Sequence, residues 1–197
     1  YRGARHALSH SVLLLLVHAN VSGASVEDID HKRIFWPREV WRKYTDKLTN
    51  FKLPQHSDQA GALRVSLLWT SLTPLAVYCL NDLITDALAH VPDCLTYMSR
   101  LRDQKVFNFC AIPQVMAVAT LAECYSNHKV FLGPVKIRRG LTAKMVDQST
   151  SMATLYFCFA VCLDLVESKL IPTDPNRQRY VPPLSLLALL TEFRAAR

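Results

Sequence analysis

The sequence predicts an all-α protein, and three observations support this. Gly is scarce, with 5 in 197 residues, and Leu, Ala and Met are frequent in the long segments, which favours helices over strands. No long segment alternates apolar and polar residues with period two. Half of the residues are hydrophobic, which suits one domain with its own core, and no internal repeat is evident.

The first expected helix covers residues 36–52 and opens with Pro37 directly after Trp36, a favoured helix start. Its inward positions at helical spacing are Val40, Trp41, Tyr44 and Leu48, and its outward positions are Arg38, Arg42, Lys43 and Lys47. Residues 51–61 are expected to form a loop. Residues 62–74 are apolar without a clean period and end in Pro74, and the sequence does not indicate their role.

Residues 75–128 carry the strongest helical pattern. One stripe follows helical spacing and consists of Val77, Leu80, Ile84, Ala87, Leu88 and Val91. Pro92 either kinks this helix or begins a second one. Residues 106–128 are apolar on nearly every face, which predicts a helix at the centre of a bundle, kinked at Pro113. Residues 141–147 and 151–169 are two further helix candidates.

Charge and cysteine content narrow the class of protein only slightly. The net charge of +7 suits an anionic ligand, a nucleic acid or an acidic membrane surface. The six cysteines show no CxxC spacing and lie mostly in apolar helical runs, at positions 79, 94, 110, 124, 158 and 162. We expect buried, reduced thiols in a cytosol-facing protein; a disulfide framework or a zinc site is the alternative.

The first 25 residues imitate a signal peptide, with a basic start, a short apolar run at residues 12–17 and small residues after it. The chain begins with Tyr rather than Met, so we expect a fragment or a processed product. No segment reaches the roughly 18 uninterrupted apolar residues of a membrane-spanning helix.

An acidic cluster, Glu27, Asp28, Asp30 and His31, precedes the first expected helix. Carboxylates at positions i and i+4 share a helix face and can hold Mg²⁺, which prefers oxygen ligands. The residue four positions before Asp28 is Ala24, so the pattern is incomplete. The cluster is either part of a metal site or a solvated acidic turn.

The stretch "GPVKIRRG" at residues 133–140 places Lys136 and Arg138 two positions apart. In an extended segment these cations point the same way, and Arg139 and Lys144 add charge nearby. A phosphate-bearing ligand suits them, and a solvated basic loop is the alternative. Nucleic acid is disfavoured, because no aromatic residues interleave with the cations.

The stretch "VFNFCAIPQ" begins the most apolar helix with Phe107 and Phe109. Aromatic faces stabilise cations by about 0.5–2 kcal/mol each in dry pockets, although ordinary core packing explains such residues equally well. The sequence contains no Gly-rich nucleotide fingerprint, no GxSxG and no HExxH.

Three stretches together resemble squalene synthase of the squalene/phytoene synthase family. They are "VFNFCAIPQVMAVATLAECYSNHKVFLGPVKIRRG" (106–140), "LAVYCLNDLITDALAHVPDCLTYMSRLRDQ" (75–104) and "FWPREVWRKYTDKL" (35–48). The resemblance covers residues 26–59 and 75–140, and more weakly 152–179. It implies an all-α isoprenoid synthase bundle that lacks its N-terminal helices. It also implies Mg²⁺-dependent joining of two farnesyl diphosphates to presqualene diphosphate and NADPH-dependent reduction to squalene.

The resemblance also implies residue roles. Lys136 and Arg138 match the family's NADPH-binding pair, and Phe109, with Phe107 beside it, matches the aromatic lining of the second half-reaction. Asp28 and Glu27 match the end of the second aspartate-rich, Mg²⁺-binding motif, and Arg33 matches a basic residue shortly after it. A monomer at the cytosolic face of the endoplasmic reticulum membrane, with no nucleic-acid partner, is expected from the family.

The departures from the family pattern define further expectations. Ala24 and Gly23 stand where that motif normally has Asp and Arg, and the first aspartate-rich motif would lie upstream of Tyr1. We therefore expect this chain to be a C-terminal part, inactive alone; a catalytically dead interaction or regulatory protein is the alternative. A phytoene-type synthase without reductase activity is disfavoured by the "VKIRRG" loop.

Two stretches do not resemble the family: residues 1–25, and residues 59–74, which look like an insertion. Our hypothesis is that both are translated non-coding sequence, because the resemblance stops at their edges and resumes in register. The tail at residues 180–197 diverges and lacks a convincing membrane anchor. Peptides spanning either junction, found by mass spectrometry of the native protein, would refute the hypothesis.

Overall fold

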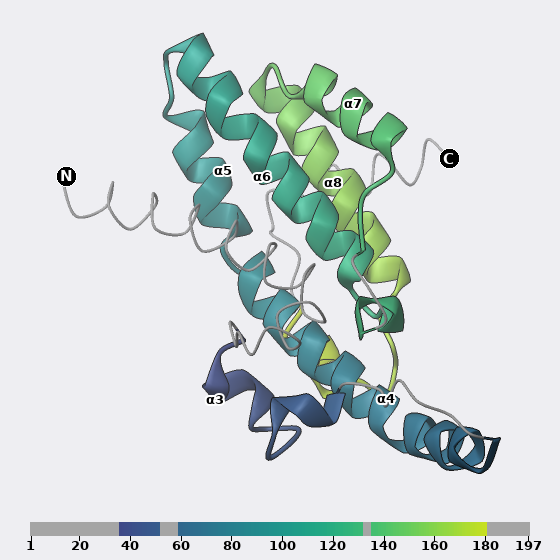
Figure 1. Cartoon of the computed structure of the whole chain (residues 1–197). Helices are drawn as coiled ribbons and strands as arrows, with labels where there is room; N and C mark the ends of the chain where they lie inside the picture. Colours follow the sequence, from purple (N-terminus) through teal and green to yellow (C-terminus); the bar gives the residue numbers. More distant parts are fainter. Residues whose placement is uncertain (1–35, 52–58, 132–134, 181–197) are drawn as a thin grey trace.

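The computed structural model describes residues 36–51, 59–131 and 135–180, which form a bundle of α-helices joined by short turns (Figure 1). In chain order the elements are α3 (Arg38–Trp41), η1 (Leu48–Phe51), α4 (Gln59–Leu88), α5 (Val91–Ser99), α6 (Gln104–Cys124), η2 (His128–Phe131), α7 (Arg139–Gln148), α8 (Met152–Ser168) and η3 (Pro175–Gln178). No strand occurs within these ranges, so the predicted all-α class is confirmed for them.

Helix α6 lies at the centre of the bundle and packs against α4, α5, α7 and α8. It runs in the same direction as α8. The side-chain amide of Gln104 donates to the carbonyl of Thr150 at one end (2.8 Å), and the ammonium of Lys169 donates to the carbonyl of Ala122 at the other (2.6 Å). By length and composition alone α6 could also cross a membrane, but half of its apolar window is buried in the bundle, as in the core helix of a soluble protein.

The predicted helix at residues 36–52 is wrong in its length. Only Arg38–Trp41 is α-helical, although Val40 and Trp41 are buried as expected. The hydroxyl of Thr45 donates to the carbonyl of Lys47 (3.1 Å) and accepts from the amide of Asn50 (3.0 Å). Such local bonds offer the backbone an alternative to helical hydrogen bonding, and the chain turns here.

Helix α4 spans 30 residues and continues through Pro74, so residues 59–74 are helical backbone in line with the segment that follows. The predicted loop at residues 51–61 is therefore wrong at residues 59–61, where the helix has already begun. The predicted stripe is confirmed: Val77, Leu80, Ile84, Ala87, Leu88 and Val91 are all buried. Pro92 lies in the first turn of α5 and begins that helix, which decides between the two alternatives.

The remaining elements follow the sequence closely. Ser151 and Thr154 form a reciprocal capping box at the start of α8. Helix α6 continues through Pro113.

An aromatic cluster joins the first described segment to η2. It consists of Trp36, Phe51 and Phe131, which pack edge to face or tilted with ring centroids 6.0–6.5 Å apart. All six cysteines are free, and all but Cys110 are buried, which confirms the predicted burial for five of them.

Candidate functional site

The described candidate residues lie on two elements. Phe107 and Phe109 begin α6, and Lys136 and Arg138 lie in the segment that leads into α7. The other candidates, Asp28, Glu27 and Arg33, lie outside the described residues.

The start of α6 is fixed by its N-cap. The carboxylate of Asp103 accepts from the backbone N–H groups of Lys105 (2.8 Å) and Val106 (3.1 Å). One turn further on, the amide of Gln104 donates to Asn108 (2.7 Å). These bonds set the helical phase of the two phenylalanines that follow.

The structure separates the two phenylalanines. Phe107 is 5% exposed and belongs to the core, whereas Phe109 is 79% exposed. Two residues along an α-helix correspond to a rotation of about 200°, so the two rings leave opposite sides of the helix. Phe107 therefore packs as a core residue, and Phe109 is the aromatic group available to a ligand.

Phe109 belongs to an apolar strip that we call the open face of α6. Its members are exposed or half-buried and recur at helical spacing: Phe109, Pro113, Met116 and Thr120. The prediction that α6 lies at the centre of the bundle is confirmed, and this face is its least covered side. A partly exposed apolar strip on a central helix is suited to contact with a hydrocarbon ligand or another apolar surface.

Lys136 and Arg138 follow the alternation expected of an extended segment. Val135 and Ile137 are half-buried against the core, and the two cations between and after them are exposed. Arg138 has extended backbone angles, φ −63° and ψ 133°. Both cations therefore project from the same side and can act together on one anionic group.

A cluster that the sequence analysis missed joins α3, α4 and the end of the described chain. We call it the polar hub: Lys43, Tyr44, Asp82, Asp86 and Arg179. Asp82 is 1% exposed, and its carboxylate accepts from Lys43 (2.8 Å), from Tyr44 (3.2 Å) and from the guanidinium of Arg179. Arg179 also donates to Asp86, one helical turn along α4. The i, i+4 spacing of the two aspartates was the signal in the sequence.

The ionisation of the polar hub follows from burial and charge. Burial raises the pKa of Tyr44 to about 12, and the neighbouring Asp82 carboxylate contributes to the rise. Burial alone would lower the pKa of Arg179, but Asp82 and Asp86 together raise it above its ordinary value. The phenol is therefore neutral and the guanidinium charged at physiological pH, which is the state that the hydrogen bonds require.

A second set of bonds extends the polar hub toward the C-terminal end of α6. Asn81 donates to Asp174 (2.6 Å) and to the hydroxyl of Ser126 (3.1 Å), and it accepts from the backbone N–H of Ser126 (2.8 Å). Ser126 has φ 51°, a left-handed conformation that is costly for a residue with a side chain. The two hydrogen bonds between Asn81 and Ser126 stabilise this conformation, so the backbone at Ser126 is held in one geometry.

Neither set forms a metal site. Within residues 36–51, 59–131 and 135–180, no group of three or more His, Cys, Asp or Glu side chains could hold a metal ion. The Asp82 carboxylate already faces two cationic side chains. The metal ligands expected from the sequence, Asp28 and Glu27, lie in a part that the structure does not describe.

Comparisons with known proteins agree with this architecture. The family model "Squalene/phytoene synthase" matches residues 16–140. Squalene synthase from Nicotiana benthamiana is 44% identical over 187 residues, which are 93% of this chain and 42% of the relative. Squalene synthase 3 from Panax ginseng is 43% identical, with 93% of this chain and 41% of the relative covered. The chain thus spans less than half the length of these curated relatives.

A solved structure shows the same arrangement. The structure of TcSQS in complex with the ligand E5700 superposes with a TM-score of 0.77 at 33% sequence identity, and it covers 96% of this chain and 51% of that chain. The complex of TcSQS with BPH1237 gives a TM-score of 0.76. The fold is therefore the all-α isoprenoid synthase fold, and the chain belongs to the squalene/phytoene synthase family.

Proposed function

We propose that this chain is the C-terminal part of an enzyme of squalene synthesis and is inactive alone. The reaction of the whole enzyme is the Mg²⁺-dependent joining of two farnesyl diphosphates to presqualene diphosphate and its NADPH-dependent reduction to squalene. The observation that carries the proposal is the identity of 42–44% to squalene synthases over 93% of the chain. The exposed pair Lys136 and Arg138 supports the reductive half, because it suits a phosphate-bearing cofactor.

The open face of α6 forms one wall of the substrate pocket in this proposal. Its apolar side chains contact the prenyl chains and keep water from a carbocation. The ring of Phe109, 79% exposed on this face, stabilises the cation through its π-system. Phe107 supports that wall from the core side of the helix.

Lys136 and Arg138 hold the NADPH phosphates, together with Arg33. The two described residues fit this role, because both are exposed, both are cationic and both project from one side of an extended segment. When bound, NADPH supplies the hydride for the reduction. The chain's own contribution is to neutralise and position the phosphate groups.

Asp28 and Glu27 contribute to a Mg²⁺ site that neutralises the diphosphate groups of the substrate. Carboxylate oxygens are the donors that Mg²⁺ prefers. We propose further that the protein works as a monomer at the cytosolic face of the endoplasmic reticulum membrane. Sedimentation of the native protein tests the monomeric state, and fractionation of native cells tests the location at the membrane.

Titration of the purified chain with NADPH tests the cofactor site. Replacing both cations, Lys136→Ala with Arg138→Ala, is expected to weaken binding at least tenfold, because two charge-assisted contacts to phosphate are lost. Lys105→Ala is the matched control, since Lys105 is an exposed cation at the other end of the bundle. Equal affinities for wild type and double variant would contradict the proposal.

A second candidate is a catalytically inactive family member that acts as an interaction or regulatory protein. Ala24 and Gly23, at positions where the family motif has Asp and Arg, favour it. A full-length cDNA read separates the two. A transcript that extends upstream into an acidic DxxED-bearing helix supports the enzyme. A transcript that begins near Tyr1 and includes residues 1–25 and 59–74 supports the interaction protein.

A further inference from the structure

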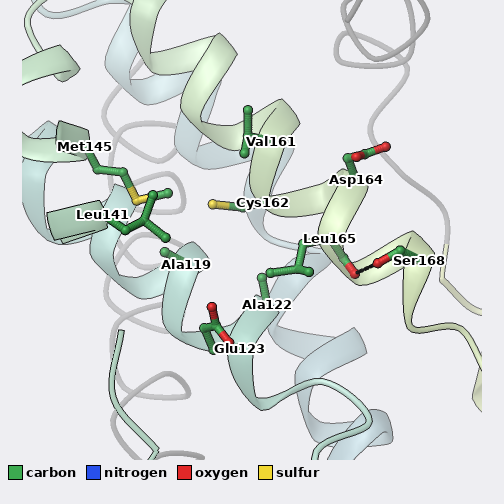
Figure 2. Close-up of a pocket in the computed structure, with 10 residues that line it drawn as sticks. All are labelled: Ala119, Ala122, Glu123, Leu141, Met145, Val161, Cys162, Asp164, Leu165 and Ser168. Atoms are coloured by element: carbon green, nitrogen blue, oxygen red, sulfur yellow. Dashed lines mark hydrogen bonds between the residues drawn. The ribbon is translucent and has the colours of Figure 1, made fainter. Parts of the chain in front are cut away.

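A cavity of about 230 Å³ lies between α6, α7 and α8 (Figure 2). It contains none of the residues given a role in the proposed function. Its walls are mainly apolar and include Ala119, Ala122, Leu141, Met145 and Leu165. An apolar protein cavity of about 150 Å³ can hold benzene, so this volume accommodates a short hydrocarbon chain.

One carboxylate gives the cavity a negative charge. In Figure 2 the carboxylate of Glu123 is directed into the space between the helices, whereas that of Asp164 is directed away from it. The thiol of Cys162 also faces the cavity. Burial raises the pKa of this thiol to about 12, so it is neutral at physiological pH. Glu123 is therefore the carboxylate that a ligand meets inside the cavity.

The adjacent lysine does not occupy the cavity. The ammonium of Lys169 donates to the backbone carbonyls of Ala122 (2.6 Å) and Glu123 (3.2 Å), at the C-terminal end of α6. Within the described residues, no hydrogen bond joins it to the Glu123 carboxylate, although the two opposite charges are near enough to attract each other. A helix C-terminus attracts cations, which explains why this ammonium stays at the carbonyls.

We propose that this cavity binds a small organic cation of the short-chain alkylammonium class. The hydrocarbon chain packs among the alanine, leucine and methionine side chains, and the ammonium pairs with Glu123. Apolar contact supplies the affinity, and the charge decides which of several equally apolar molecules binds. This site is independent of the proposed function, because neither diphosphate nor NADPH takes part in it.

Titration of the full purified chain with n-hexylammonium, followed by NMR, tests the proposal. Two molecules of similar size but different charge, n-hexanol and hexanoate, serve as comparisons. We expect n-hexanol to bind at least tenfold more weakly and hexanoate not to bind. Equal binding of hexanoate and n-hexylammonium would overturn the proposal, whatever the result of the NADPH titration.

Two substitutions locate the site. Glu123→Gln preserves size and is expected to weaken n-hexylammonium binding at least tenfold, whereas Asp147→Asn, on the exposed side of α7, is expected to leave it unchanged. Ala119→Leu fills the cavity and is expected to abolish binding of both amine and alcohol, whereas Ala143→Leu, at an exposed position, is not. Unchanged affinity in Glu123→Gln, with a native circular dichroism spectrum, refutes the assignment.

Discussion

The polar hub and the open face of α6 differ in the exposure of their side chains and in the number of hydrogen bonds that those side chains form. In the hub, a carboxylate that is 1% exposed has three donors, two from adjacent residues after α3 and one from the end of the described chain. On the open face, an aromatic ring is 79% exposed and stands beside half-buried apolar neighbours. In the polar hub, the polar groups hold three segments in a fixed arrangement. On the open face, apolar surface stays accessible to a ligand. Function is therefore expected at the second region and stability at the first.

The largest expected effect comes from the two phenylalanines of α6, which differ only in the side of the helix they occupy. Phe107→Ala removes a buried ring and is expected to lower the free energy of unfolding by about 3–5 kcal/mol. Phe109→Ala removes an exposed ring and is expected to change it by less than about 0.5 kcal/mol. Urea unfolding measures both. Similar losses for the two variants would show that Phe109 is also packed in solution.

The two aspartates of the polar hub give the next largest difference. Asp82→Ala leaves Lys43, Tyr44 and Arg179 without their shared acceptor, and it is expected to cost about 2–4 kcal/mol of stability. Asp86 is 39% exposed and contacts Arg179, so Asp86→Ala is expected to cost less than about 1 kcal/mol. Thermal unfolding of both variants tests this. A cost for Asp86→Ala as large as that for Asp82→Ala would contradict it.

The buried thiols predict how stability depends on pH. Burial, with a contribution from Asp93, raises the pKa of Cys94 from 9.0 to about 12. Its stabilising contribution is complete below pH 9. As the pH rises from 9 toward 12, the unfolded chain releases a proton that the folded chain keeps, and stability falls.

The slope from one such thiol is at most about 1.4 kcal/mol per pH unit. Cys94→Ala is expected to reduce the alkaline slope of the unfolding free energy by up to that amount. Leu95→Ala is the control, because it also loses buried volume but no ionisable group. Urea unfolding at several pH values between 9 and 11 gives both slopes, and parallel curves for wild type and Cys94→Ala would refute the prediction.

The smallest effect concerns the two ends of α6. Lys169 donates to the last carbonyls of this helix, so Lys169→Met is expected to cost about 1 kcal/mol. Burial lowers the pKa of this ammonium, which reduces the benefit. Lys105 is exposed at the opposite end, where a cation is unfavourable, and Lys105→Met is expected to be neutral or slightly stabilising. Equal losses at both ends would mean that the helix dipole is not involved.

Much of the fold was predictable, because burial follows helical spacing. The stripe from Val77 to Val91, the helix start next to Pro92 and the helix start after the N-cap Ser151 depend on neighbours in sequence, and the structure confirms them. The end of α3 was not predictable in this way. Its first turn has helical periodicity, but the hydroxyl of Thr45 and the hub contacts of Lys43 and Tyr44 favour a turn.

The candidate site was predictable to a smaller extent. Apolar and cationic residues alternate at residues 135–138, and this pattern predicted that Lys136 and Arg138 project from the same side. The different positions of Phe107 and Phe109 required knowledge of which side of α6 is covered, since the helix is apolar all round. The hub required partners far apart in the sequence, such as Arg179 and Asp82, which no local pattern connects. The roles of Asp28, Glu27 and Arg33 stay predictions.

The contact of Arg179 with both Asp82 and Asp86 fixes the rotational phase of α4. One guanidinium reaches two carboxylates because they stand four residues apart on the helix. Inserting or deleting one residue at positions 83–85 would turn Asp86 by about 100° around the axis and out of reach. Substitutions at positions 83–85 preserve the rotational position of Asp86, whereas insertions and deletions do not. The number of residues between Asp82 and Asp86 is therefore constrained more strictly than the identity of those residues.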